Sequence, residues 1–581
     1  MQIREVTEIL MPRNIRSPDL EILRPDEKRY TCLLLQPGGP IFAGTQRIGT
    51  LDVNEGSRKA RHFLRLAIQR QAHLAVTPEY FFPWAVLQSE LLLGAKPADG
   101  ALWVLGCESI QSDALADFKE KVAEFCEVIY EPVEALPADR TLLDPVILLF
   151  QTTLQSGEPR TVALVQFKTF PSRDNTFFEE SLLRRGTTVY KFKGADGHLS
   201  VAVIICSDAF ELTDDVIPNL IDRSTLIHIQ LNPSPRNSVY RQYRKTTFET
   251  DSSTSECHII CLNWAGSVVQ HAEDGSTEDW PPVAGSAWYC PDARCKHDDA
   301  IVLPNHVLGL YYAYMEERRH ALLFHYCEAV FELLVPKVVT KGKAVMANRN
   351  GPTASERFCW DVAASTWQPS PRPVDSGFAA LLAGNPEANA ALTHALTGAS
   401  AIDVERLLAL TAGAMSGMEN WFSTKEIDSC KIGPDEVVRR VTVAQDNDPQ
   451  AVGFRHGRLE TAAELRQILD THSNWPPQLA GITKDALIEW SAALPHFNVR
   501  SVDGRSALIV HAGNTVPPPR TLENLAAKLT NLLRKAGGDD QKRLCVLYRR
   551  FGELKFATLP LTRFDDALED ETDILAVQPQ D

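Results

Sequence analysis

The chain has 581 residues, of which 44% are hydrophobic, and its formal net charge is -16 at pH 7. A single hydrophobic core stops growing at about 250 to 300 residues, so this length predicts at least two domains. The acidic charge argues against a general electrostatic attraction to nucleic acid or to an anionic membrane surface.

The N-terminal residues mix charged with apolar side chains and lack the continuous apolar segment of a secretory signal. No uncharged apolar run reaches the roughly 18 residues that a membrane-spanning helix needs. The 12 cysteines are few for a chain of this length, and several lie inside apolar runs, so we expect reduced thiols. These features predict a soluble protein of the cytoplasm.

Residues 31–335 alternate short apolar runs with helical periodicity, which is typical of a layered α/β domain. In residues 57–71, the side chains of Ala60, Phe63, Leu64 and Ala67 share one face and predict an amphipathic surface helix. A second helix, expected at 320–337, would close the domain near Pro336. The segments predicted as strands are 32–36, 73–78, 101–108, 145–153, 161–168, 200–206, 226–232 and 258–264.

Two regions flank this domain in the predicted organisation. Residues 1–30 form an N-terminal extension, and residues 336–377 form a linker region, because prolines and small polar residues are concentrated at 366–377. Residues 378–581 are predicted as a smaller, mainly helical α+β domain, with two strands and a short glycine-containing turn within 543–559.

Three of the predicted strands end on residues whose side chains can take part in catalysis, namely Glu79, Lys168 and Cys206. Ligand sites in α/β sheets lie just beyond strand ends. A thiol is mostly protonated at neutral pH and needs a base, which Glu79 would supply. Lys168 and the backbone N–H of Ser207 would then stabilise the negative charge of a tetrahedral adduct. Taken alone, Cys206 would be a small core residue, so the prediction depends on the three residues together.

The order Glu, Lys, Cys, within the segments PEYFF, QFKTFPSRDNTFFEE and VIICSDAFE, resembles the nitrilase superfamily of carbon-nitrogen hydrolases. The resemblance continues in IQLNPSPR and HIICLNWAGS, covers about residues 31–335 and leaves out the C-terminal part. It implies a four-layer α-β-β-α sandwich that forms homo-oligomers and needs no metal or cofactor. It also implies that Glu79 is the general base, Lys168 supports the oxyanion and Cys206 is the nucleophile.

Members of this family carry a second glutamate between the lysine and the cysteine, several residues before a glycine. Gly186 fits that glycine, so Glu179 is the matching residue, and the adjacent Glu180 stays the alternative. The implied role of Glu179 is to position Lys168 and to assist the hydrolytic step. Because they lie next to predicted strand ends, the candidate substrate-binding residues are Tyr80, Asp208, Asn232 and Trp264.

The expected function is thiol-dependent hydrolysis of a non-peptide carbon-nitrogen bond, an amide rather than a nitrile, through a thioester on Cys206. Two alternatives stay open: a catalytically silent binding module with the same fold, and an acyltransferase that passes the acyl group to an amine. The C-terminal domain has no motif with assignable chemistry. By analogy with nitrilase-like domains of bacterial defence or signalling proteins, we expect it to gate the enzyme or to bind a protein partner.

Other chemically suggestive residues are assigned structural roles. The segment CPDARCKH, with Cys290, Cys295 and His297, has only half of a paired zinc knuckle and is predicted as a loop. His320 and His325 are five residues apart and lack the intervening glutamate of a zincin helix, so they predict no metal site.

Overall fold

The computed structural model describes most of the chain. The described residues are 1–132, 141–173, 178–220, 224–233, 257–280, 286–290, 305–315, 319–346, 351–370, 382–396, 449–482, 485–489, 497–534 and 542–557, apart from gaps of one or two residues, with short pieces inside 242–247, 373–379 and 404–412 and at 423–424. They form a mixed α/β structure with several sheets. The chain divides into two compact units, and the first comprises Met1–Gly377 together with Ser400–Ile402 and Phe422–Asn447.

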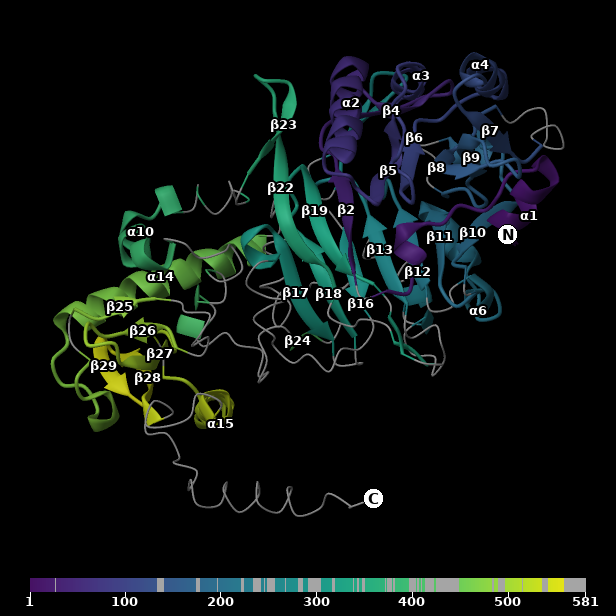
Figure 1. The fold of residues 1–581 in the computed structure, drawn as a ribbon. Helices are drawn as coiled ribbons and strands as arrows, with labels where there is room; N and C mark the ends of the chain where they lie inside the picture. Colours follow the sequence, from purple (N-terminus) through teal and green to yellow (C-terminus); the bar gives the residue numbers. More distant parts are fainter. Residues whose placement is uncertain are drawn as a thin grey trace. The chain divides into compact units, whose positions relative to one another are not determined.

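Two large sheets form the centre of the first unit (Figure 1). In spatial order the first contains β1 (Gln2–Glu5), β10 (Thr188–Lys193), β11 (Ser200–Ile205), β12 (Ser224–Ile229), β13 (His258–Leu262), β16 (Ala287–Cys290), β18 (Arg319–Phe324), β17 (Leu310–Met315) and β24 (Ser423–Thr424). The second contains β23 (Thr366–Pro369), β22 (Thr353–Asp361), β19 (Ala329–Pro336), β2 (Arg29–Gln36), β5 (Leu74–Phe82), β6 (Leu102–Cys107), β8 (Pro145–Thr153), β9 (Pro159–Phe167) and β7 (Glu127–Tyr130).

The two sheets stack face to face, as the alternation of side chains along their strands shows. In β5, Leu74 and Val76 join a core that also contains Val201 and Ile227 of the first sheet. The intervening Ala75 joins a second core on the opposite face. Because both faces of these strands are buried, their sequences are continuously apolar rather than alternating.

Helices cover the outer face of the second sheet (Figure 1). They are α2 (Val53–Gln69), α3 (Trp84–Leu92) and α4 (Ser112–Val122). The side chain of Asp52 caps α2 by accepting a hydrogen bond from the Glu55 N–H at 2.9 Å, which satisfies one of the free donors of its first turn. The face predicted to be apolar is confirmed, since all four of its predicted residues are buried.

The other elements of the first unit are short. The helical ones are α1 (Val6–Leu10), α5 (Glu179–Leu182), α6 (Ile217–Leu220) and the 3-10 turns at Met11–Arg13, Glu21–Leu23 and Cys206–Glu211. A small sheet contains β15 (Thr277–Asp279), β14 (Val269–Ala272), β3 (Ile41–Ala43) and β4 (Ile48–Thr50), and β20 (Val339–Lys341) pairs with β21 (Ala344–Met346).

All the segments predicted as strands in the first domain are strands in the structure, but the helix predicted at 320–337 is wrong. Those residues form β18 and β19, separated by a turn at 325–328. Both strands are paired with neighbours on either side and buried on both faces. A continuously apolar segment of this kind carries no periodicity that separates a strand from a buried helix.

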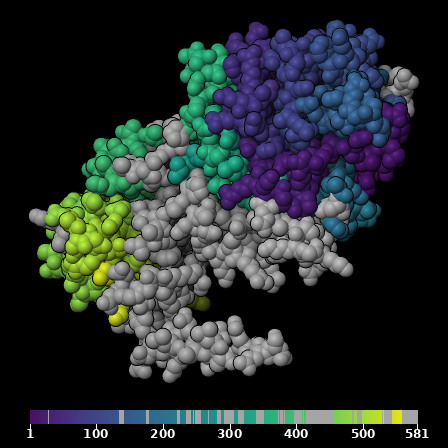
Figure 2. All heavy atoms as spheres, viewed as in Figure 1, coloured from purple at the N-terminus to yellow at the C-terminus, as the bar shows by residue number. Residues whose placement is uncertain are grey.

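The regions expected as extension and linker are part of the sheets. Strand β1 pairs with β10, so the first residues complete the first sheet. Within 336–377, β22 pairs with β19, and Trp367 of β23 donates its indole N–H to the backbone oxygen of Lys59 in α2 at 3.1 Å. Figure 2 shows this teal hairpin against the purple surface of α2. Strands β22 and β23 therefore extend the second sheet, so this part of the expected linker does not simply join two domains.

The second unit contains Phe378–Ala399, Asp403–Trp421 and Asp448–Asp581. Its sheet has the order β25 (Leu487–Ile488), β26 (Val499–Arg500), β27 (Ser506–His511), β28 (Leu544–Arg550) and β29 (Glu553–Phe556). Its helices include α10 (Pro386–Ala391), α11 (Thr393–Leu396), α14 (Pro449–Thr471) and α15 (Pro519–Arg534). The predicted glycine-containing turn is present, with Phe551 and Gly552 at φ of 51° and 82° between β28 and β29. Within the described residues, no helix has both the length and the apolarity to cross a membrane.

Candidate active site

Cys206 follows the last residue of β11, a strand that runs parallel to β12 in the first sheet. Its backbone has a φ of 40°, a left-handed conformation that non-glycine residues rarely adopt and that is concentrated at functional sites. The side chain is 3% exposed, and its thiol faces the backbone oxygen of Leu231 at 4.0 Å. The strand therefore ends by turning sharply and presenting a buried thiol.

Asp208 holds this sharp turn in place. One carboxylate oxygen accepts a hydrogen bond from the Ile205 N–H at 3.0 Å, and the other accepts from the N–H groups of Thr169 and Phe170 at 2.7 and 3.0 Å. Burial raises the pKa of Asp208 to about 6, although these backbone donors favour the ionised form. Asp208 was predicted to contact substrate, but both of its oxygens bind the protein's own backbone, which ties the turn to the segment after Lys168.

Glu79 lies in β5 where the pairing with β6 is irregular between Thr77 and Phe82. Gly106 permits this irregularity, because a Cβ atom there would lie 2.2 Å from the Pro78 carbonyl oxygen. The indole N–H of Trp264 donates to the backbone oxygen of Glu79 at 2.9 Å. The Glu79 carboxylate accepts hydrogen bonds from the Lys168 ammonium at 2.7 Å and from the Leu231 N–H. Leu231 thus contacts both Glu79 and Cys206 through its backbone.

Lys168 and Glu179 complete the group. The Lys168 Nζ atom lies 2.9 Å from the Glu179 carboxylate, which also accepts from the Tyr80 hydroxyl at 3.0 Å and from the Ser172 N–H at 2.6 Å. Glu180, the alternative considered from the sequence, is exposed and pairs with Arg185 instead. The glutamate that contacts Lys168 is therefore Glu179.

Gly186, the residue that identified Glu179 in the sequence, is explained by close packing. Its N–H donates to the backbone oxygen of Lys168 at 2.7 Å, and a Cβ atom there would lie 2.5 Å from the Phe167 carbonyl oxygen. A glycine at this position lets the chain pass directly beside the residue that carries the ammonium.

Asp144 is a member of the site that the sequence analysis missed. Its Oδ2 atom lies 3.4 Å from the Lys168 Nζ atom. Glu79, Asp144 and Lys168 are each 1% exposed, and Glu179 is 3% exposed. One carboxylate oxygen from each of Glu79, Asp144 and Glu179 lies within 4.8 Å of the other two, close enough to hold a metal ion. The Lys168 ammonium lies within 3.4 Å of each of these carboxylates, so it already occupies the position of a cation among them.

Burial and charge set the protonation of the group. Burial alone would lower the pKa of Lys168, but Glu179, Glu79 and Asp144 together raise it well above its usual value, and an ionised Cys206 would contribute in the same direction. Burial raises the pKa of Glu79, and Lys168 only partly opposes this. The site therefore contains a permanent ammonium beside a carboxylate with increased proton affinity, which suits a general base.

A buried histidine that the sequence analysis did not select supports the nucleophile. The His228 Nε2 atom in β12 lies 2.8 Å from the backbone oxygen of Cys206, and its Nδ1 atom lies 2.7 Å from the Tyr243 hydroxyl. Burial lowers the pKa of His228 to about 3, so the ring is neutral. His228 sits inside an apolar strand, and no motif in the sequence marks it.

The remaining predicted residues are arranged around this group. Tyr80 has a φ of 57° and binds Glu179, and Trp264 binds the backbone of Glu79. The Asn232 backbone pairs with the side chain of Asn263. The Ser207 hydroxyl donates to the Phe170 carbonyl oxygen at 2.6 Å. Tyr80 therefore contacts a carboxylate of the cluster and Trp264 the backbone of another member, whereas these hydrogen bonds of Asn232 and Ser207 are to neighbouring loops.

Residues that the sequence analysis set aside lie elsewhere. Cys290 is buried in β16, and Cys295 and His297 fall outside the described residues. His325 is buried in the turn between β18 and β19, and His320 lies in β18 rather than in a helix.

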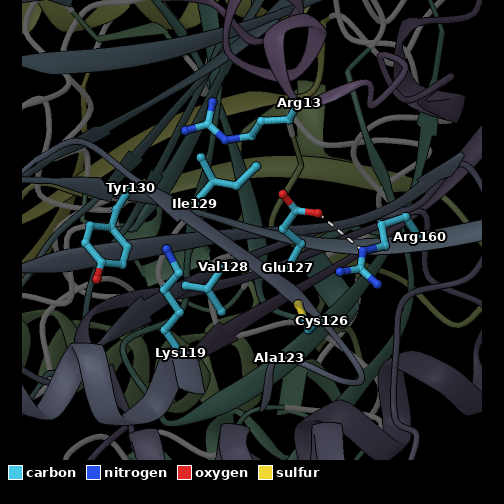
Figure 3. A pocket seen from close by; sticks show the side chains of 9 residues that line it. All are labelled: Arg13, Lys119, Ala123, Cys126, Glu127, Val128, Ile129, Tyr130 and Arg160. Atoms are coloured by element: carbon cyan, nitrogen blue, oxygen red, sulfur yellow. Dashed lines mark hydrogen bonds and ion pairs between the residues drawn. The ribbon is translucent and has the colours of Figure 1, made fainter. Parts of the chain in front are cut away.

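A groove of about 160 Å³ lies at the edge strand β7 (Figure 3). The residues that line it are Arg13, Lys119, Ala123, Cys126, Glu127, Val128, Ile129, Tyr130 and Arg160. Its thiol, Cys126, has a pKa raised to about 12 by burial, so it is not a nucleophile at neutral pH. This groove contains none of the residues predicted to be catalytic.

No protein-family model and no curated protein matches this sequence. Among solved structures it is similar to a glutamine-dependent NAD+ synthetase from Acinetobacter baumannii in complex with adenosine diphosphate, with 13% identity, a TM-score of 0.31, and coverage of 55% of this chain and 49% of that chain. A glutamine-dependent NAD(+) synthetase from Cytophaga hutchinsonii gives 8% identity, a TM-score of 0.24, and coverage of 44% and 40%. The chain spans half or less of the length of these proteins. At such TM-scores the similarity carries no argument about activity.

Proposed function

We propose that the first unit hydrolyses a non-peptide carbon-nitrogen bond, an amide rather than a nitrile, through a thioester on Cys206. The observation that carries this proposal is the contact of one backbone residue, Leu231, with both partners of the first proton transfer. Its N–H binds the Glu79 carboxylate, and its carbonyl oxygen faces the Cys206 thiol at 4.0 Å. The base and the nucleophile thereby contact the backbone of the same residue.

In the first half-reaction, Glu79 takes the proton from Cys206 and the sulfur attacks the amide carbon. The Lys168 ammonium and the Ser207 N–H stabilise the oxyanion of the tetrahedral adduct. Glu79 then gives its proton to the nitrogen, the carbon-nitrogen bond breaks, and ammonia or an amine leaves. The strained backbone of Cys206 and the buried ammonium are in place before substrate binds, so they need no rearrangement during the reaction.

In the second half-reaction, Glu79 takes a proton from water, and the resulting hydroxide attacks the thioester carbon. The carbon-sulfur bond breaks, the acid is released, and the thiolate regains its proton from Glu79. The hydrogen bonds of Glu179 with Lys168 and Tyr80 support its role in orienting the ammonium throughout. An amine in place of water would make the same site an acyltransferase.

The test is release of ammonia from a panel of small primary amides by the full chain, with and without hydroxylamine as an acceptor. We expect turnover that Cys206→Ala lowers by about 1000-fold or more. Cys359→Ser is the matched control, because this thiol is half-buried in β22, away from the site, and its loss should leave the rate unchanged. Hydroxamate formation that exceeds hydrolysis would favour the acyltransferase. Binding without turnover would favour the silent module.

The second unit contributes none of the proposed catalytic residues. A gating or partner-binding role for residues 378–581, a homo-oligomeric assembly and a cytoplasmic location are proposals that accompany this function. For the second unit, the specific proposal is that it changes the turnover rate of the first unit. Once turnover is established, measuring the rate before and after limited proteolysis would test this.

A further inference from the structure

Asp144 lies in the site with its carboxyl group almost completely excluded from water. It immediately precedes β8, and its backbone oxygen accepts a hydrogen bond from the Lys168 N–H at 2.9 Å. Its side chain is 1% exposed and reaches the Lys168 ammonium only at 3.4 Å. Neither of its carboxyl oxygens accepts a hydrogen bond from any described residue. A buried carboxylate left in this state would be strongly destabilising.

The other two carboxylates of the cluster are well supplied with donors. Glu79 accepts from Lys168 and from the Leu231 N–H. Glu179 accepts from Lys168, the Tyr80 hydroxyl and the Ser172 N–H. If Asp144 were also ionised, one ammonium would face three carboxylates in a buried space, leaving two uncompensated negative charges. The hydrogen bonds indicate which carboxyl group is protonated, because Asp144 is the one that accepts none.

As a neutral acid, Asp144 gains an O–H donor and needs an acceptor. Glu79 is the acceptor, because one of its carboxyl oxygens lies within 4.8 Å of one of Asp144 and, in addition to burial, a hydrogen bond with Glu79 contributes to raising the pKa of Asp144. The titratable groups that face Asp144 are Glu79 and Tyr80 from β5, Cys107 from the end of β6, Lys168 after β9, and Glu179 from α5. Among these groups, Lys168 is the cation, and its shortest contacts are to the two glutamates.

We propose that Asp144 is a positioning residue of this site that stays protonated and donates a hydrogen bond to the Glu79 carboxylate. The proposal rests on the proposed function insofar as Glu79 is the base whose proton affinity this hydrogen bond adjusts. Burial raises the pKa of Asp144 well above its usual value, and the charge of Glu79 adds to this effect, in the same direction as the geometry. The extra proton reduces the uncompensated negative charge of the cluster from two to one.

The test compares Asp144→Asn with Asp208→Asn in the full chain. Asn is neutral, has nearly the shape of a protonated aspartic acid and keeps a donor, so it mimics the proposed state of Asp144. Asp208 is the matched control because it is equally buried but accepts hydrogen bonds from backbone N–H groups. We expect Asp144→Asn to be at least as stable as the wild type at pH 7.5, and Asp208→Asn to have a lower unfolding midpoint.

The pH dependence of stability gives the sharper readout. A folded state that keeps a proton on Asp144 binds one more proton than the unfolded chain above about pH 4, so wild-type stability falls as pH rises. Asp144→Asn removes this proton. As pH rises from 5 to 8, the ratio of the unfolding equilibrium constant of Asp144→Asn to that of the wild type should therefore fall by up to about tenfold for each pH unit. A difference in stability between Asp144→Asn and the wild type that does not change with pH would overturn the proposal. So would a loss of stability in Asp144→Asn equal to that in Asp208→Asn.

A second measurement needs only the wild-type protein and no substrate. Infrared spectra at pH 7.5 with 13C-labelled aspartate should contain the carbonyl band of a protonated carboxylic acid that shifts with the label. Absence of this band would overturn the proposal even if the variants failed to fold. Because neither measurement uses turnover, they remain informative if the protein hydrolyses no amide. If it does, Asp144→Asn should keep its kcat/KM within about threefold, whereas Asp144→Ala should lower it about tenfold or more.

Discussion

The Nε2 atom of His228 donates a hydrogen bond to the backbone carbonyl oxygen of Cys206, at 2.8 Å. A carbonyl oxygen can only accept, so Nε2 carries the proton and Nδ1 accepts from the Tyr243 hydroxyl. The ring thereby supports the one residue at the end of β11 whose backbone has a left-handed φ. This contact joins β12 to the strained turn that presents the thiol.

Replacing His228 should disturb that turn. His228→Ala leaves a buried carbonyl without its donor, and we expect a loss of about 1 to 3 kcal/mol in the free energy of unfolding. Alkylation of Cys206 should slow by about tenfold as the backbone relaxes. His228→Gln keeps an N–H donor and should recover most of both effects. Equal behaviour of the two variants in urea unfolding and in labelling would contradict a role for this hydrogen bond.

The neutral state of His228 also predicts acid sensitivity. Because burial lowers its pKa from 6.5 to about 3, the folded state binds fewer protons than the unfolded chain between these values. The stability from this neutral ring is complete above pH 6.5 and is lost as pH falls toward 3, by up to about 1.4 kcal/mol per pH unit. As pH falls through this range, the free energy of unfolding of the wild type minus that of His228→Gln should decrease at up to this rate. A difference that is constant with pH would contradict the assignment.

The position of Glu79 depends on a glycine in the neighbouring strand. A Cβ atom on Gly106 would lie 2.2 Å from the Pro78 carbonyl oxygen and 2.8 Å from the Glu79 nitrogen. Gly106→Ala should therefore destabilise the protein by about 2 kcal/mol or more and slow any Glu79-dependent reaction. The matched control is Gly457→Ala in α14, where nothing lies within 4 Å and alanine should stabilise by up to about 1 kcal/mol. Thermal unfolding of both variants checks the contrast.

Lys168 holds a cluster that would otherwise repel itself. Lys168→Met keeps most of the side-chain volume but removes the cation, which should cost about 3 to 5 kcal/mol near neutral pH. The cost should be smaller at pH 5 than at pH 8, because the remaining carboxyl groups can then take up protons on folding. Urea unfolding at the two pH values checks this. A cost that is larger at pH 5 would show that the carboxylates do not depend on Lys168 for their charge balance.

The Tyr80 hydroxyl donates a hydrogen bond to the same Glu179 oxygen that accepts from the Lys168 ammonium. Tyr80→Phe removes this donor and keeps the ring, whose centroid lies 5.8 Å from the Lys168 ammonium. We expect about a fivefold lower kcat, which corresponds to one hydrogen bond of about 1 kcal/mol, with little change in KM. Tyr130→Phe in the separate groove is the control and should leave kcat unchanged. A change confined to KM would instead place the hydroxyl against substrate.

The sequence predicted the residues at strand ends because their chemistry contrasts with the apolar strands that deliver them. Glu79, Lys168 and Cys206 each follow a continuously buried run, and the structure brings Lys168 to both glutamates. The spacing to Gly186 favoured Glu179 over Glu180, and in the structure Glu179 is buried against Lys168 whereas Glu180 is exposed. Asp208 was predicted to bind substrate, but it instead holds the turn at Cys206 by accepting hydrogen bonds from backbone N–H groups of two segments.

Other parts of the site carried no usable signal. Asp144 precedes a proline, which is typical of an exposed turn, and only the folded arrangement shows it beside Lys168. His228 lies within an apolar run, where a histidine is usually a structural residue. The helix wrongly predicted at 320–337 failed for a related reason, since strands buried on both faces lose the alternation that identifies them.

The proposed hydrolysis requires Cys206 to be an activated nucleophile, and iodoacetamide labelling with peptide mapping tests this directly. Among the cysteines that the structure describes, Cys206 is buried whereas Cys327 and Cys359 are more exposed, so exposure alone would label those two before Cys206. We predict that Cys206 of the full-length wild type is labelled first between pH 6 and 8, and that Glu79→Gln abolishes this preference. Faster labelling of Cys327 and Cys359, with Cys206 unaffected by Glu79→Gln, would contradict the account.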